Sequence, residues 1–133
     1  MPHIVIECSD NVGRQADMPA LVKRIHRAVL GTGVFPIGGT RTRLSERSIY
    51  EIADGAPENG FVHVTMRIAA GRDAETKHRA ASAIFDELCA ALEPLYERMP
   101  LGISLEMVEL DPALSFKKNN LHEYVEERKA AKV

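Results

Sequence analysis

The feature of this sequence that most constrains its fold is a repeated order of short strands and helices. Residues 3–8 are rich in β-branched side chains and predict a strand. A helical pattern follows, with Asp17 as N-cap, Pro19 in the first turn and Gly31 as a stop. Extended stretches at 40–44 and 47–53 complete the first unit, before the turn ADGAPENG.

The second half repeats this order. Residues 61–69 alternate, with apolar side chains at the even positions, and so predict a strand with one buried face. Asp73 should cap a longer helix, which Pro94 should kink near its end because proline removes one backbone donor. The stretch ISLEMVEL, residues 103–110, predicts the closing strand. The apolar positions expected to face the core are Leu21, Val22, Ile25, Val29 and Leu30 in the first helix, and Ala81, Ile84, Phe85, Leu88, Leu92, Leu95 and Met99 in the second.

Two successive β-α-β units predict an α+β domain in which both helices cover one face of a shared sheet, because such crossovers are nearly always right-handed. The single domain spans 1–133, with pseudo-repeats at about 2–57 and 58–122 and an extension at 122–133. In this extension, residues from about His122 to Lys129 should form a short amphipathic helix. The other face of the sheet should carry Phe61 and Thr65, with His3 and Val5. We expect this half-apolar face to be covered by further copies of the chain.

Composition excludes several classes of protein. A net charge of −2 over 133 residues gives no basic surface for nucleic acid. No apolar run approaches the ~20 residues of a membrane span, and no leader pattern begins the chain, so we expect a cytoplasmic protein. Cys8 and Cys89 have no metal or redox spacing and are expected to be reduced. The sequence lacks HExxH, a P-loop, a complete GxGxxG and GxSxG, which predicts no metal and no cofactor.

Pro2 and three arginines are the residues that could carry chemistry. Pro2 either begins a strand where no backbone donor is needed, or becomes a free secondary amine when Met1 is removed. Arg41 and Arg43 share one strand face by alternation, and the Gly38-Gly39 pair before them forms a turn or admits a ligand. Arg72 precedes a helix N-terminus. It binds an anion there, or it pairs with Asp73, Glu75 or a neighbouring subunit.

Four segments together resemble the 5-carboxymethyl-2-hydroxymuconate isomerase family of the tautomerase superfamily: PHIVIECSDN, TGVFPIGGTRTR, FVHVTMRIAAGR and LSFKKNNLH. The resemblance covers about residues 2–122. It implies a tautomerase-like fold with a four-stranded mixed sheet, a homotrimer with sites near subunit boundaries, and catalysis without cofactor or metal. Pro2 matches the catalytic amino-terminal proline, and Arg41 and Arg72 match the active-site arginines. The tail EYVEERKAAKV departs from the pattern.

The implied reaction belongs to the breakdown of homoprotocatechuate. A dienol with three carboxylates is ketonised, with Pro2 moving the proton and Arg41 and Arg72 holding carboxylates. Burial and nearby arginines should lower the pKa of the Pro2 amine. Two alternatives stay open. Related enzymes dehalogenate or decarboxylate small acids with the same proline, and a doubled β-α-β sheet could also be a small-molecule-binding module without catalysis.

Overall fold

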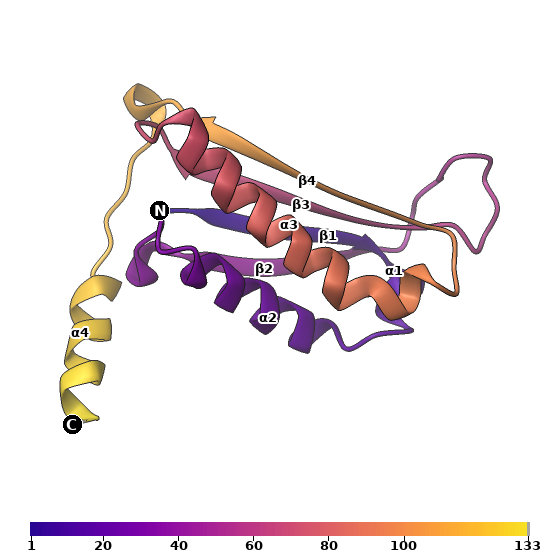
Figure 1. Cartoon of the computed structure of the whole chain (residues 1–133), viewed down its shortest axis with the longest axis horizontal. Helices are drawn as coiled ribbons and strands as arrows, with labels where there is room; N and C mark the ends of the chain where they lie inside the picture. Colours follow the sequence, from indigo (N-terminus) through magenta and orange to yellow (C-terminus); the bar gives the residue numbers. More distant parts are fainter. Residues whose placement is uncertain (133) are drawn as a thin grey trace.

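A four-stranded mixed sheet forms the frame of the molecule in the computed structural model, which describes residues 1–132 (Figure 1). The strands are β1 (His3–Ser9), β2 (Arg41–Arg47), β3 (Gly60–Ala69) and β4 (Leu101–Leu110). Their order across the sheet is β2-β1-β3-β4. β1 pairs with β2 in parallel and with β3 in antiparallel fashion, and β3 pairs with β4 in parallel. This arrangement confirms the predicted α+β fold with a mixed sheet.

Two helices, α2 (Met18–Gly31) and α3 (Ala74–Tyr96), lie on the same face of the sheet (Figure 1). Both begin at the predicted caps. The Asp17 carboxylate accepts from the Ala20 backbone N–H at 3.0 Å, and the Asp73 carboxylate from that of Thr76 at 2.7 Å. Both helices therefore start where an aspartate satisfies a backbone donor that the first turn leaves free.

The core lies between these helices and the sheet. Every even residue from Val62 to Ile68 is fully buried, as the alternation in the sequence predicts. The row of core-facing residues on α3 begins one residue earlier than expected, because Ala80 is fully buried while Ala81 is only half-buried. Pro94 lies in the last turn of α3, which ends shortly after it at Tyr96, so its missing donor interrupts little of the helix.

The predicted extended stretch at 47–53 is wrong. β2 ends at Arg47, and the chain from there to Gly60 forms bends and turns. Ala53 and Gly55 have positive φ angles of 54° and 84°, which a strand does not allow. A short helix, α1 (Asp10–Gly13), which the sequence did not predict, follows β1 directly.

The sheet face opposite the helices carries more polar side chains than predicted. Phe61, Thr65, His3 and Val5 lie half-buried on it, as expected. Between them, hydrogen bonds link Arg43 to His3 at 3.1 Å and His63 Nε2 to the Glu106 carboxylate at 3.1 Å. The face is therefore more polar than the predicted half-apolar face, because cross-strand polar pairs occupy much of it.

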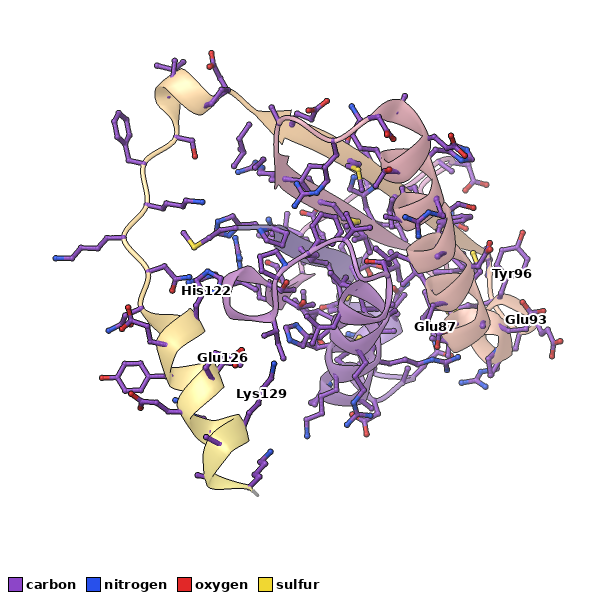
Figure 2. All side chains as sticks on the ribbon, turned by 60° about the vertical axis from the view of Figure 1, so that its left-hand side comes forward. Glu87, Glu93, Tyr96, His122, Glu126 and Lys129 are labelled. Carbon is purple, nitrogen blue, oxygen red and sulfur yellow. The ribbon has the colours of Figure 1, made fainter. Side chains whose placement is uncertain are left out.

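After β4 the chain turns through η2 (Pro112–Leu114), crosses the end of the sheet beside the amino terminus and enters α4 (Leu121–Ala131) (Figure 1). The predicted terminal helix is confirmed, but its amphipathic character is wrong, since its polar and apolar side chains do not separate onto opposite faces and none of its residues is buried. His122 of α4 is directed at the 3-10 turn η1 (Ile37–Gly39) (Figure 2). Within residues 1–132, no helix is both long and apolar enough to cross a membrane.

Candidate active site at the amino terminus

The amino terminus is fixed at one end of the two central strands. Pro2 is buried, and its carbonyl accepts a hydrogen bond of 3.1 Å from the Arg41 backbone N–H. This bond continues the parallel ladder that pairs His3 with Arg41. The pairing of β1 with β2 therefore holds the start of the chain in one place, although a chain end usually lacks such restraint.

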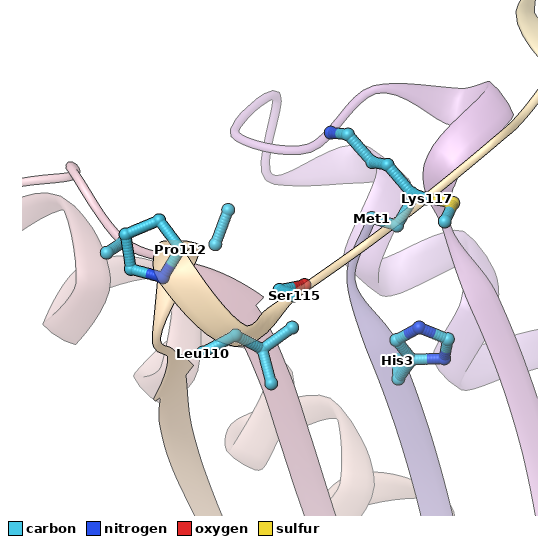
Figure 3. Close-up of a pocket in the computed structure, with 8 residues that line it drawn as sticks. Met1, His3, Leu110, Pro112, Ser115 and Lys117 are labelled. Atoms are coloured by element: carbon cyan, nitrogen blue, oxygen red, sulfur yellow. The ribbon is translucent and has the colours of Figure 1, made fainter.

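A cavity of about 230 Å³ opens beside this end of the chain (Figure 3). Its walls come from the start of β1, the ends of β3 and β4, and the segment that follows η2. The lining residues are Met1, His3, Ala69, Ala70, Leu110, Pro112, Ser115 and Lys117. None of these lining residues is acidic, so the part of the chain that the structure describes presents no carboxylate to an anionic ligand in the cavity.

The guanidinium of Arg41 lies close to this chain end. Its Nη1 donates to the Gly39 carbonyl at 2.8 Å, and its Nη2 donates to the Asn119 Oδ1 at 3.3 Å. Both acceptors are neutral. Arg41 is therefore oriented by its neighbours while its positive charge stays uncompensated by them.

Arg72 approaches the terminus from the other side of β1, on the segment between β3 and α3. Its guanidinium donates at 3.3 Å to the carbonyls of Ala69 and Val34, and it lies 4.8 Å from the centre of the Phe35 ring. The possible pairing of Arg72 with Asp73 or Glu75 is wrong, because neither carboxylate forms an ion pair with it within residues 1–132. Asp73 instead caps α3.

These cations act together on the terminal amine. The pKa of the Met1 amine is lowered, first by burial and then by the positive charges of Lys117, Arg72 and Arg41. Each of these effects disfavours the protonated amine. The pKa of His3 is also lowered, chiefly by burial and by the neighbouring Arg43. The site therefore favours the neutral forms of the terminal amine and of the His3 imidazole, and it favours negative charge on a ligand.

The comparisons with known proteins agree with this geometry. Residues 2–125 match the family described as 5-carboxymethyl-2-hydroxymuconate isomerase. The chain belongs to this family. A family member from Escherichia coli, 5-carboxymethyl-2-hydroxymuconate Delta-isomerase, is 38% identical over 122 residues, which are 92% of this chain and 97% of that relative.

Two solved structures of the isomerase family share the fold over nearly their whole length. The 5-carboxymethyl-2-hydroxymuconate isomerase from Deinococcus radiodurans R1 has a TM-score of 0.87 and 32% identity, and the alignment covers 93% of each chain. A second structure, of a 5-carboxymethyl-2-hydroxymuconate delta-isomerase, has a TM-score of 0.87 and 30% identity, covering 94% of this chain and 93% of that one. The resemblance inferred from the four sequence segments is thus confirmed.

Within this family member, the structure brings the predicted site residues Pro2, Arg41 and Arg72 to one end of the sheet in a single protomer. Arg43 shares the strand face of Arg41, as predicted, but its guanidinium bonds His3 rather than the terminus. The Gly38-Gly39 pair forms a turn, which confirms the simpler of its two readings.

Sequence reasoning did not identify three residues of this region: Phe35, Lys117 and Asn119. Phe35 supports the Arg72 guanidinium, and Asn119 binds both Arg41 and the Gly38 carbonyl. Lys117 lines the cavity. The segment LSFKKNNLH marked family resemblance, yet nothing in it indicates that the chain returns across the first strand. Within residues 1–132, no group of three or more His, Cys, Asp or Glu side chains is placed to hold a metal ion.

Proposed function

We propose that the chain is an isomerase that converts 5-carboxymethyl-2-hydroxymuconate to its keto isomer in the breakdown of homoprotocatechuate. The observation that carries this proposal is the position of the amino terminus. It lies beside a cavity whose described lining has no carboxylate, and both Arg41 and Arg72 are close to the terminal amine. Membership of the isomerase family supports the choice of substrate. The substrate's three carboxylates match the positive charge of the site.

In the proposed mechanism, Pro2 is the base and then the acid. Removal of Met1 turns the Pro2 nitrogen from an amide, which is not basic, into a secondary amine. The neutral amine takes the proton of the 2-hydroxyl, and a dienolate forms. The electrons then shift along the diene, the ammonium returns the proton to carbon 5, and the product is an enone with its carbonyl at carbon 2. One group moves the proton both ways, so no cofactor enters the balance.

Arg41 and Arg72 bind substrate carboxylates in this proposal. A guanidinium presents paired N–H groups that match the two oxygens of a carboxylate. Both side chains are already oriented by hydrogen bonds to neutral oxygen atoms. Donors that are fixed before the reaction stabilise the negative charge of the dienolate without reorganising, which lowers the barrier.

The decisive experiment compares mature protein, whose sequence begins at Pro2, with protein that keeps Met1 or carries one added residue before Pro2. Mass spectrometry defines each terminus, and the loss of dienol absorbance measures turnover. We expect the blocked forms to lose activity by orders of magnitude while their circular dichroism and assembly stay unchanged. Full activity in protein with Met1 demonstrably retained would refute the mechanism. Pro2→Ala keeps a primary amine and should retain a small part of the activity.

We also propose that the chain assembles as a homotrimer through the face opposite the helices. Phe61 and Thr65 are half-buried there, and Phe116, beyond β4, is 90% exposed in the single chain. Sedimentation equilibrium should give three chains per particle at micromolar concentration. Phe61→Asp should weaken the assembly, whereas Ala90→Asp, on the exposed side of α3, should not; a monomeric parent protein would contradict the proposal.

A further inference from the structure

The segment of residues 115–120, here called the crossing segment, carries the amino-terminal site's remaining cation. It leaves η2, passes over the cavity and reaches α4 (Figures 1 and 3). Ser115 and Lys117 of the crossing segment line the cavity together with Met1 and His3. A segment from the far end of the chain therefore forms one wall of a site that is otherwise built from the sheet.

Both ends of the crossing segment are held in place. Before it, the Asp111 carboxylate caps η2 by accepting from the Ala113 backbone N–H at 2.9 Å. Within it, the Asn119 amide donates to the Gly38 carbonyl at 3.0 Å, while its oxygen accepts from Arg41 at 3.3 Å and from the Leu121 backbone N–H at 3.1 Å. The position of Lys117 is thus set by the same side chain that orients Arg41.

Within residues 1–132, Lys117 has no acidic partner. The ion pairs within residues 1–132 do not include Lys117, Arg41 or Arg72. Elsewhere on the same molecule cations such as Arg24, Arg47 and Lys77 do pair with glutamates. All three cations act on the Met1 amine beside the cavity, although only Lys117 lines the cavity itself. Cations without carboxylate partners near one another repel, and a ligand with several negative charges would remove this cost.

We propose that Lys117 is a substrate-binding residue that holds the third carboxylate of a tricarboxylate, while Arg41 and Arg72 hold the other two. This inference rests on the proposed function for the identity of the ligand. The inference adds that Lys117 makes the protein select tricarboxylates over dicarboxylates, because acids that lack the third carboxylate should bind without a contribution from Lys117. Lys118 is a matched control, since it is the next residue of the same exposed segment but does not line the cavity.

The test is calorimetric binding to the mature protein, with 2-(carboxymethyl)adipate as a saturated tricarboxylate probe and adipate as the dicarboxylate. One charge-assisted pair corresponds to roughly a ten- to hundredfold change in affinity. Because Lys117 is exposed, Lys117→Ala should weaken binding of the tricarboxylate by about tenfold, at the lower end of this range. It should change binding of adipate by less than about twofold, and Lys117→Arg should restore most of the loss.

Equal losses for the two acids, or equal effects of Lys117→Ala and Lys118→Ala, would overturn the assignment of Lys117. Binding does not depend on turnover, so this result is separate from the test of Pro2. If the mature protein fails to isomerise the dienol but Lys117→Ala still weakens only the tricarboxylate, the catalytic proposal fails and the binding role of Lys117 stands. If the protein isomerises the dienol and Lys117→Ala has a normal KM, only the role of Lys117 fails.

Discussion

Replacing Arg72 by alanine should impair catalysis far more than it impairs folding. In the structure the guanidinium donates two hydrogen bonds, both at 3.3 Å, which is long, and it lies 4.8 Å from the centre of the Phe35 ring. These contacts of a half-buried side chain contribute about 1 kcal/mol to the free energy of unfolding. Loss of a charge-assisted pair with a substrate carboxylate should cost roughly 1.5–3 kcal/mol of binding, which is about ten- to a hundredfold in affinity.

The assay compares kcat/KM for the tricarboxylate dienol and for a version that lacks one carboxylate, alongside urea denaturation of each variant. Arg72→Ala should lose most of the enzyme's preference for the fuller substrate, and Arg72→Lys should fall between because it keeps the charge without the paired donors. Arg79→Ala, which removes an exposed arginine from α3, is the control and should change neither quantity. Normal turnover of both substrates by an Arg72→Ala protein that only unfolds more easily would show that Arg72 is structural.

Three further predictions concern the terminus, the tail and the core. The pKa of the Met1 amine is lowered by burial and by Lys117, Arg72 and Arg41. We expect the Pro2 amine, one residue further along the chain, to be affected in the same direction, so the kcat/KM of the mature enzyme should rise with pH with a midpoint below ~8, the ordinary value for an α-amino group. A midpoint at or above that value in the pH profile would contradict this. Gly38→Ala should displace α4 and reduce activity, because an added Cβ would lie 2.8 Å from the His122 Cα. Limited proteolysis of the tail measures this displacement. Gly31→Ala is the control and should leave the tail protected, because an added Cβ there meets open space. Ile84→Ala should lower the free energy of unfolding by roughly 2–5 kcal/mol in urea denaturation, since the side chain is fully buried. A loss under about 1 kcal/mol would contradict this and would show that neighbouring side chains fill the space left by the isoleucine.

Local patterns in the sequence were sufficient to predict the sheet and its two long helices. Alternation in residues 61–69 predicts which side chains are buried. Asp17 and Asp73 mark helix starts because their carboxylates accept hydrogen bonds from backbone donors that the first turn leaves free. The stretch 47–53 contains residues common in strands, yet among residues 1–132 no strand pairs with it beyond Arg47. Strand formation depends on such a partner, which a local pattern does not reveal.

The residues of the candidate site were predictable only in part, for the same reason, and their roles stay a prediction. Pro2, Arg41 and Arg72 could be named from family resemblance and from their places at the ends of predicted elements. Lys117 and Asn119 belong to the site because the chain returns over β1 after β4, and that return depends on contacts far apart in sequence. The pairing of Arg72 with Phe35 is likewise a contact between distant segments.

The sheet has an approximate twofold axis between its central strands, since β1 with β2 and β3 with β4 are antiparallel copies of one another. The fold therefore has two equivalent ends, but only one of them can carry the proposed chemistry. At the other end β3 begins with Gly60, whose nitrogen is an ordinary amide in mid-chain. An added Cβ there would lie 2.7 Å from the Met99 Cε and 3.1 Å from the Val12 Cγ2, so that end is filled by packed side chains. The repeated arrangement thus supplies two similar sheet ends but only one chain terminus, and we expect each chain to have one turnover site and one end whose residues serve stability alone.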